Sequence, residues 1–354
     1  MTKKELNERL PGEYEKQRAM ILLFPYREDV WRCGCEPARR MIIGLANILA
    51  ESQKTYLGVL PALVDDVRNS YRINPNVEII SVKYNDCWAR DTISSVVKGE
   101  QPYIAGFKFN SYGSGLYFPW DDDDKLDESI AQIFGYKLYN SEIILEGGNI
   151  MPDGNGTVIA VKAGIVNENR NPHLSVSEIE KEILRNTSSK KIIWISRGLY
   201  GDETGGHIDN VLSFASANEI ILSWTDDIDN PNYKIVREVE ETLMNATNAN
   251  GEAYRIIHLP LPAYHYRTEE ECEGIITKAG SEPRLPGDIV LETYTNFALG
   301  NEVVIVPQFG NEKKDKAAID ILRSIFTNRK VIPFPGREAT LGGGGFHCLT
   351  KHIS

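Results

Sequence analysis

The sequence contains no long hydrophobic run and no segment that resembles an export signal. None of its apolar stretches approaches the ~20 residues that a membrane-spanning helix requires. The first residues, MTKKELNERLPGEYEK, are charged and lack the apolar core of a secretory signal. We therefore expect a cytoplasmic protein that does not act at a membrane.

Cysteine is scarce and scattered. The 354 residues include five cysteines, at positions 33, 35, 87, 272 and 348. An odd, widely spaced set does not form the framework of a disulfide-rich domain. Cys33-x-Cys35 also has no second Cys or His pair at the spacing of a zinc site. We expect reduced thiols and no metal ion.

Basic residues are fewer than acidic ones. The chain has 39 Lys and Arg against 50 Asp and Glu, a formal net charge of −11. Nucleic-acid binding requires a basic face, so this charge argues against nucleic acid as a partner. Negative potential raises the local concentration of cations, so the same charge suits a small cationic ligand.

The order of the predicted elements indicates an α/β protein. Helical apolar spacing is found in residues 37–53 and 314–326, and residues 175–185 open with a Ser-x-Ser-x-x-Glu capping arrangement. Strand-like segments alternate with them. They are residues 19–25, 77–82, 93–97, 156–161, 191–196, 219–224, 302–309 and 330–334.

No low-complexity linker divides the chain, so we expect a single catalytic domain over residues 1–354. An acidic run at residues 121–124 follows Phe118-Pro119-Trp120. Most runs of like charge are solvated, so we expect this one to be a surface loop.

Polar blocks recur along the chain at predicted strand ends. They are WARDT (88–92), EGGNI (146–150), HIDN (207–210), YTNF (294–297) and GFHC (345–348). Counted from positions 91, 146, 209, 296 and 348, the steps are 55, 63, 87 and 52 residues. The blocks differ in sequence, so this is not a solenoid repeat. The spacing predicts several supersecondary units of similar size, each of which delivers one block to a central site.

These blocks supply five candidate catalytic residues: Asp91, Glu146, His207, Asp209 and Cys348. A thiol that follows a glycine run (342–345) is a candidate nucleophile. We expect His207-Ile208-Asp209 to form a strand, which would place both polar side chains on one face. Each residue alone has an ordinary structural explanation, such as a cap, a turn or a core histidine. It is much less probable that all five are structural.

Cysteine, histidine and carboxylate also describe papain-like hydrolases. A neutral peptide amide, however, gains nothing from two buried anions beside it. A guanidinium is planar and cationic, and its N–H pairs match the two oxygens of a carboxylate. The extra carboxylates therefore favour attack on a guanidinium carbon.

At these residues the chain resembles the agmatine deiminases, within the bacterial peptidyl-arginine deiminase family of the guanidino-group-modifying superfamily. The resemblance covers essentially the whole chain. It is carried by PGEYEKQRAMILLFP (11–25), DVWRCGCEPARR (29–40), WARDT (88–92), LEGGNI (145–150), NENRNPHLS (167–175), DETGGHIDN (202–210), YTNFALGN (294–301), VPQFG (306–310) and GGGGFHC (342–348). It implies a five-bladed α/β propeller, the pentein fold, with the site at its pseudo-fivefold axis.

The resemblance also implies a role for each residue that matches the family motifs. Cys348 corresponds to the nucleophile, and His207 to the general acid and base. Asp91 and Asp209 correspond to the pair that grips the guanidinium, and Glu146 to a further site carboxylate. Two more positions correspond to substrate-binding residues, Trp88 and Glu203.

The implied reaction is the hydrolysis of agmatine to N-carbamoylputrescine and ammonia through a covalent amidino-cysteine, as a step of putrescine biosynthesis, with no cofactor. The chain departs from the family pattern at three places. It has Ile93-Ser94 where the family usually has Gly-Pro, Gly205 where Asn is usual, and Gly345 where Asn is frequent. None of these departures removes a reacting group.

Three alternatives remain open: a deiminase acting on peptidyl or free arginine, an amidinotransferase, and a non-catalytic polyamine-binding protein. The oligomeric state is open too, a homo-oligomer included. Agmatine carries a second cation and no carboxylate. We therefore expect Glu203 and Trp88 to line its tail and no arginine to be placed there to meet a carboxylate.

Overall fold

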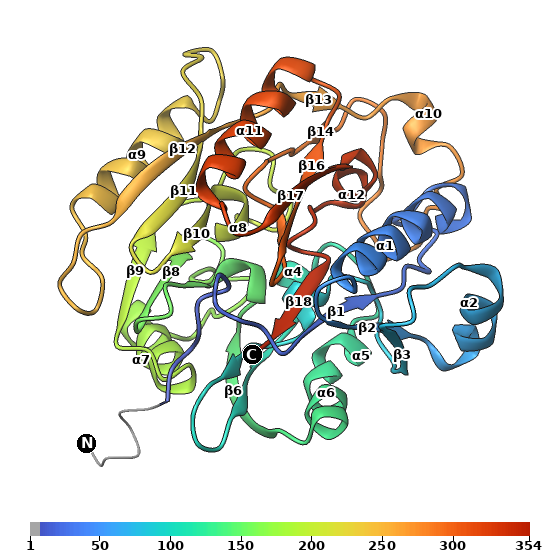
Figure 1. Cartoon of the computed structure of the whole chain (residues 1–354), viewed down its shortest axis with the longest axis horizontal. Helices are drawn as coiled ribbons and strands as arrows, with labels where there is room; N and C mark the ends of the chain where they lie inside the picture. The colour runs from blue at the N-terminus through green and yellow to red at the C-terminus, as the bar shows by residue number, and fades with distance from the viewer. Residues whose placement is uncertain (1–7) are drawn as a thin grey trace.

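The computed structural model describes residues 8–354, and most of its strands form five mixed sheets around a common centre (Figure 1). Four of the sheets have three strands each and the fifth has four. The sheets are β18 (Thr350–Ile353), β1 (Ala19–Leu23), β2 (Lys54–Val59) and β3 (Val77–Ser81); β4 (Val96–Val97), β5 (Tyr103–Lys108) and β6 (Lys137–Ile144); β7 (Met151–Pro152), β8 (Thr157–Val161) and β9 (Lys191–Ile195); β10 (Leu212–Ser216), β11 (Glu219–Trp224) and β12 (Arg255–Pro260); β15 (Ala298–Leu299), β16 (Val303–Gln308) and β17 (Lys330–Pro335).

Each sheet repeats one topology. A first strand pairs antiparallel with a second, which pairs parallel with a third. Parallel neighbours need a crossover, and here each crossover contains a helix on the outside of the ring (Figure 1). The main crossover helices are α1 (Glu36–Leu49), α6 (Leu126–Phe134), α7 (Val176–Asn186), α9 (Tyr233–Met244) and α11 (Glu312–Ile325). Five such units are consistent with five blades.

The ends of the described chain close the ring. Strand β18 pairs antiparallel with β1, with Ala19 opposite Ile353 and Leu22 opposite Thr350. The first strand of this sheet therefore comes from the C-terminus, while its other strands come from the N-terminal part of the chain. This pairing fixes Cys348, two residues before β18, against the N-terminal sheet.

The shorter elements connect these units. They are η1 (Cys33–Cys35), η2 (Pro61–Leu63), α2 (Val64–Ser70), α3 (Ala89–Thr92), α4 (Ser111–Ser114), α5 (Asp121–Asp124), η3 (Gly147–Asn149), α8 (Ile208–Val211), β13 (His265–Tyr266), α10 (Glu269–Cys272), β14 (Ile289–Val290) and α12 (Arg337–Gly342).

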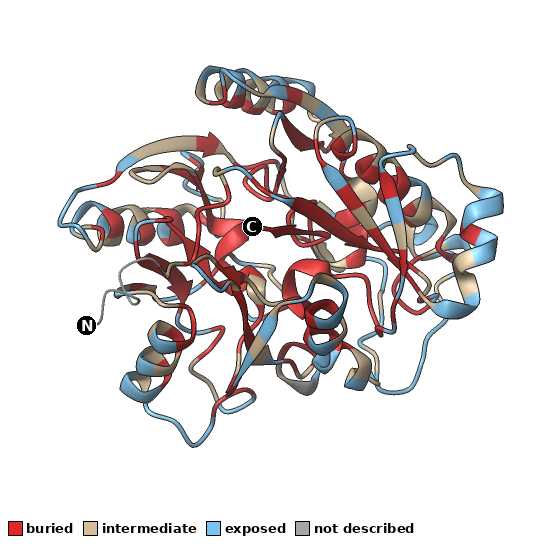
Figure 2. Ribbon diagram, turned by 60° about the horizontal axis from the view of Figure 1, so that its bottom comes forward, coloured by how far each residue is buried: buried red, intermediate tan, exposed pale blue. Residues whose placement is uncertain are grey.

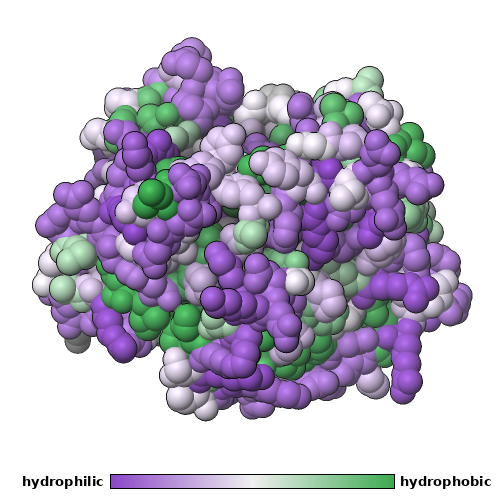
Figure 3. Space-filling model, turned by 90° about the horizontal axis from the view of Figure 1, so that it is seen from above, coloured by the Kyte–Doolittle hydropathy of each residue, from purple (hydrophilic) through white to green (hydrophobic). Residues whose placement is uncertain are grey.

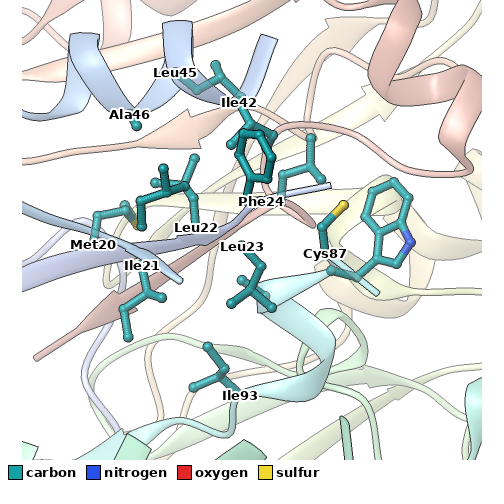
Figure 4. Close-up of a cluster of buried hydrophobic side chains, with 14 of the residues drawn as sticks. Met20, Ile21, Leu22, Leu23, Phe24, Ile42, Leu45, Ala46, Cys87 and Ile93 are labelled. Carbon is teal, nitrogen blue, oxygen red and sulfur yellow. The ribbon is translucent and has the colours of Figure 1, made fainter. Parts of the chain in front are cut away.

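The core lies between the sheets and their crossover helices, and exposed residues gather on the outer faces of the helices (Figure 2). Every residue of β1 is buried. Successive strand residues point to opposite faces, and Figure 4 shows Leu22 and Phe24 on the side of Ile42 of α1, with Leu23 on the side of Ile93. Because both faces are covered, β1 is a continuous apolar run without alternation.

The polar blocks occupy equivalent places in the five units. Each block lies immediately before the first strand of a sheet, at α3 before β4, η3 before β7, α8 before β10, residues 294–297 before β15 and residues 345–348 before β18. Contacts join the blocks to one another: the Gly148 N–H donates to Asp91, and Asn296 and Asp209 both contact Cys348 Sγ. The inference from block spacing is therefore confirmed: the units bring their blocks to one place.

Three local predictions differ from the structure. Residues 207–210 do not form a strand, because Ile208–Val211 is a helical turn that begins after His207. Residues 121–124 form the short helix α5, and Asp123 is buried there, where it accepts hydrogen bonds from the Asn85 N–H (2.7 Å) and the Tyr117 hydroxyl. The predicted strand 93–97 is shortened to Val96–Val97. The other predicted strands and helices are present, with ends shifted by up to four residues.

The outer surface is mainly hydrophilic. Figure 3 shows hydrophilic residues over most of one face, with hydrophobic residues gathered in its lower half. Within the described residues, no helix has the length and apolar character needed to cross a membrane.

A capping box is formed at the start of α7 by Ser175 and Glu178, and not by Glu180, the glutamate of the predicted Ser-x-Ser-x-x-Glu pattern. The Ser175 hydroxyl accepts from the Glu178 N–H, and the Glu178 carboxylate accepts from the Ser175 N–H (2.8 Å). We expect Ser175→Ala to lower the free energy of unfolding by about 1 kcal/mol, because it removes an N-cap. Urea denaturation would measure this. Ser177→Ala, at an exposed position inside the same turn, is the matched control and should cost nothing. Equal effects of the two changes would contradict the capping role.

Candidate active site

Cys348 lies in the turn between α12 and β18, beside Asn296 and Asp209. Its Sγ is 3.2 Å from Asn296 Nδ2 and 3.4 Å from Asp209 Oδ2. Asn296 Oδ1 also accepts from the N–H groups of His347 (3.0 Å) and Cys348 (3.3 Å). The preceding glycines are required here, because a side chain at Gly345 would overlap Asn296 and Gly343 has a φ of 113°.

Asp91 is held on the first turn after Trp88. Its Oδ1 accepts from the Gly148 N–H at 2.8 Å, and its Oδ2 accepts from the Tyr112 hydroxyl at 3.0 Å. Burial raises the pKa of Asp91 to about 6, although the positive charge of His207 opposes the shift. Both oxygens are thus fixed in place, and a nearby cation would favour the ionised form.

Glu146 is paired with the guanidinium of Arg170. Both of its oxygens accept from Arg170 Nε, at 2.8 and 3.1 Å, and Arg170 Nη2 donates to the Thr204 carbonyl at 2.6 Å. Burial acts to raise the pKa of Glu146, but the Arg170 guanidinium and the nearby His207 bring it below its usual value. Glu146 is therefore a fixed, buried negative charge.

His207 lies between two of these carboxylates. Its Nδ1 is 3.7 Å from Asp91 Oδ1 and its Nε2 is 3.9 Å from Glu146 Oε2. Burial alone would lower the pKa of His207, but the charges of Asp91 and Glu146 raise it to about 9. The backbone N–H of His207 donates to Asp202 at 2.9 Å. His207 is therefore charged near neutral pH, as a proton donor must be.

Asp209 is oriented by a chain of buried charges. His347 Nδ1 lies 2.8 Å from Asp209 Oδ2, and His347 Nε2 lies 2.9 Å from Glu13, which also pairs with Arg90 at 2.6 Å. Burial and Arg90 act to lower the pKa of His347, but Glu13 and Asp209 raise it. A carboxylate at each ring nitrogen favours the imidazolium, since each nitrogen then donates.

Two buried polar atoms are left open beside Cys348. Among the described residues, neither Asp209 Oδ1 nor His207 Nε2 has a hydrogen-bond partner. His207 lines a pocket together with Asp91, Trp88 and Cys348. Asp209 contacts groups that line this pocket. An unmet buried acceptor is costly, so a donor-rich cationic ligand between Asp91 and Asp209 would satisfy the open oxygen of Asp209.

The Cys348 thiol is protonated in the ligand-free site. Burial, together with the negative charges of Asp209 and Asp91, raises its pKa well above the usual value. A cation placed between the two aspartates would act in the opposite direction and favour the thiolate. Nucleophile and ligand are thus coupled electrostatically.

The structure brings all five predicted catalytic residues to one site, and both predicted tail residues line the same pocket. The pocket also contains Arg284, whose guanidinium donates to both oxygens of Glu203 and to the Gly342 carbonyl (3.0 Å). An arginine therefore lies along the expected tail, where it is paired with Glu203. Arg284 is 81 residues from Glu203 in sequence, and no local pattern connects the two.

Several residues that shape the site were not identified from the sequence. Arg170 lies in the NENRNPHLS segment and His347 is adjacent to Cys348, so both carry a local signal. Glu13 lies in the segment PGEYEKQRAMILLFP (11–25), but nothing there indicates its contact with His347, and Tyr112 lies in no such segment. Over the described part of the chain, no group of three or more His, Cys, Asp or Glu side chains is arranged to hold a metal ion.

Comparison with known proteins agrees with this geometry. The family model for Porphyromonas-type peptidyl-arginine deiminase matches residues 9–353. The chain belongs to this family. It is 35% identical over 349 residues to an agmatine deiminase of Pseudomonas aeruginosa, covering 97% of this chain and 94% of that one. The agmatine deiminase of Enterococcus faecalis superposes with a TM-score of 0.93 at 30% identity, covering 99% and 96% of the two chains.

The expected fold is confirmed as well. A dimethylarginine dimethylaminohydrolase superposes with a TM-score of 0.51 at 14% identity, covering 95% of this chain and all of the other. At that identity the likeness concerns the fold alone. Together with the match to the Enterococcus faecalis structure and the five mixed sheets, it identifies the pentein fold.

The charge chain from Glu13 to Asp209 generates a stability prediction. His347→Gln removes the cation between two buried carboxylates, so the free energy of unfolding at pH 7 should fall by about 3 kcal/mol or more. The contribution of His347 is complete below its unfolded pKa and is lost as pH rises through its raised folded pKa. The difference in the free energy of unfolding between His347→Gln and the unmodified protein should therefore become smaller in alkaline solution.

Denaturant unfolding across pH would measure this difference. His352→Gln is the matched control, because burial lowers the pKa of His352 to about 3 and its ring is neutral. Equal losses in the two variants, or a loss for His347→Gln that does not depend on pH, would contradict a charged His347.

Proposed function

We propose that the protein is an agmatine deiminase, a hydrolase that converts agmatine and water to N-carbamoylputrescine and ammonia. The observation that carries the proposal is a buried cysteine between two aspartates, one of which has an open oxygen. The family membership and the full-length relatives described above support the same activity.

The proposed mechanism begins with the two aspartates. Asp91 and Asp209 hold the guanidinium by paired N–H···O contacts, so that Cys348 Sγ faces the central carbon. The substrate cation lowers the pKa of the thiol, whose proton passes to solvent water as the substrate binds, and the resulting thiolate forms a C–S bond. His207, held charged by Asp91 and Glu146, gives its proton to one –NH₂ group of the tetrahedral adduct, and ammonia leaves.

Hydrolysis completes the cycle. Neutral His207 takes a proton from water as the oxygen attacks the amidino carbon, and the C–S bond then breaks to release the ureido product and the thiolate. Glu146 keeps His207 basic enough for both steps, since Arg170 fixes its carboxylate. We also propose that the whole chain is a single catalytic domain. The ring closed by β18 and β1, with its one central site, supports this.

Cys348→Ser tests the nucleophile. We expect kcat for ammonia release from agmatine to fall roughly a thousandfold or more, because a hydroxyl is a far weaker nucleophile without a dedicated base. The midpoint of thermal unfolding should stay within a few degrees. In the unmodified enzyme, mass spectrometry after rapid quenching should detect the amidino adduct on Cys348. Cys33→Ser, at an exposed thiol, is the control and should keep full activity. A Cys348→Ser enzyme with most of its kcat would exclude Cys348 as the nucleophile.

The second test separates agmatine from arginine. An arginine carboxylate would have to be desolvated beside Glu203, whose acceptors already serve Arg284. We therefore expect kcat/KM for agmatine to exceed that for free arginine at least about a hundredfold. A C-terminal arginine peptide should react no better than free arginine. Comparable kcat/KM values for arginine and agmatine would instead indicate an arginine deiminase, with Arg284 as the partner of the carboxylate.

A further inference from the structure

Arg284 is hydrogen-bonded to Glu203, the carboxylate that we expect to meet the distal ammonium of agmatine. Its Nη1 and Nη2 donate to the two carboxylate oxygens, with Nη2 at 2.7 Å from Oε1, and Nη2 also donates to the Gly342 carbonyl. The Arg284 side chain is only 8% exposed. The Glu203 side chain is 30% exposed, so the pair is partly open to water and its strength comes mainly from the bidentate geometry.

Arg284 belongs to the longest connection between polar blocks. Residues 261–293 lie between β12 and β15 and include β13, α10 and β14, all at one side of the ring (Figure 1). Neighbouring loops hold this segment in place. The Glu282 N–H donates to the Leu116 carbonyl (3.0 Å), Ser281 Oγ donates to Asp29 (2.7 Å), and the Ile276 N–H donates to the Glu28 carbonyl (2.8 Å). The segment therefore covers the pocket and places Arg284 inside it.

The pocket is nearly filled with Arg284 in place. Its interior leaves about 20 Å³ for the centres of water molecules, roughly the space of one ordered water. Arg284 narrows this end of the pocket together with Trp88 and Glu203, which also line it.

Cationic groups near Glu203 weaken the attraction that this carboxylate alone would exert on a second cation. Arg267 lies behind Glu203, is 5% exposed, and its Nη1 has no hydrogen-bond partner among the described residues. Burial and the charge of Arg284 lower its pKa to about 10, so it remains a cation. Asp86 and Asp288 are the other acids near Arg284. One carboxylate, Glu203, thus lies between two guanidinium groups.

We infer that Arg284 is a specificity-determining residue, which competes with the distal ammonium of the substrate for Glu203. The inference rests on the proposed agmatine deiminase function and extends it. When agmatine binds, its ammonium replaces the guanidinium at Glu203, so the net gain from Glu203 is small. A guanidine with an uncharged tail has nothing to exchange, so the Arg284–Glu203 pair stays closed.

The test is calorimetric binding in a Cys348→Ser background, in which the ligands are not turned over. The ligands are agmatine and butylguanidine, which lacks only the terminal amine. With Arg284→Met we expect the Kd for agmatine to fall at least fivefold, because Glu203 is then free. The Kd for butylguanidine should change less than twofold. Arg284→Lys, which keeps a cation at this position, should restore weaker agmatine binding.

Two controls accompany these measurements. Arg197→Met removes an exposed guanidinium that pairs with Glu238 on the surface, and it should leave both Kd values unchanged. With Cys348 intact, Arg284→Met should lower KM for agmatine and leave kcat within threefold, because Arg284 does not touch the reacting atoms.

Three results would overturn the inference. Weaker agmatine binding in Arg284→Met would mean that Arg284 positions Glu203 for the ammonium. Equal gains for agmatine and butylguanidine would mean that Arg284 only fills space. A selective loss of arginine binding, with agmatine unchanged, would make Arg284 a carboxylate anchor. If the intact enzyme released no ammonia from agmatine while the Kd values changed as expected, the proposed function would fail and the competition at Glu203 would stand.

Discussion

The concentration of buried negative charge around one cysteine is the constraint on which the rest of the site depends. Glu13, Asp91, Glu146 and Asp209 are all buried, and a buried carboxylate without a partner costs several kcal/mol. The protein compensates each with a different group: Arg90, His207, Arg170 and His347 respectively. Several of these partners are far apart in sequence, so the charges can be balanced only when the ring of five sheets is closed.

The compensation is incomplete at one point, Asp209, which is also the carboxylate beside the nucleophile. One oxygen of Asp209 is hydrogen-bonded to His347 and the other is unpaired among the described residues. Cys348 remains a thiol because buried carboxylates surround it. A planar cation would supply the missing hydrogen bonds and the missing positive charge together. Ligand binding and thiol activation are therefore one electrostatic event, which favours reaction only when a guanidinium is present.

The reactive groups could be predicted from the sequence because the five blocks have equivalent positions in five similar units. Asp91, Glu146 and Cys348 each lie just before the first strand of a sheet, which local composition and spacing reveal. The strand expected at His207 was wrong because Gly205 and Gly206 adopt positive φ values (87° and 107°) and turn the chain into a helical turn. Glu13 and Arg284 could not be predicted, since their roles depend on contacts with residues far away in sequence.

The reactive residues, which could be predicted from the sequence, and Arg284, which could not, lie in two independent parts of the pocket. The groups that would grip the guanidinium lie on the ring itself, where moving one of them would leave a buried charge unpaired. The tail end is formed in part by residues 261–293, which are held by hydrogen bonds between loops and by the ion pairs of Arg337 with Glu271 and Glu292. A substitution at Arg284 removes one cation from Glu203 and leaves every partner of Asp91, Asp209 and Cys348 in place. The preference for one tail over another can therefore change while the chemistry at the guanidinium carbon stays the same.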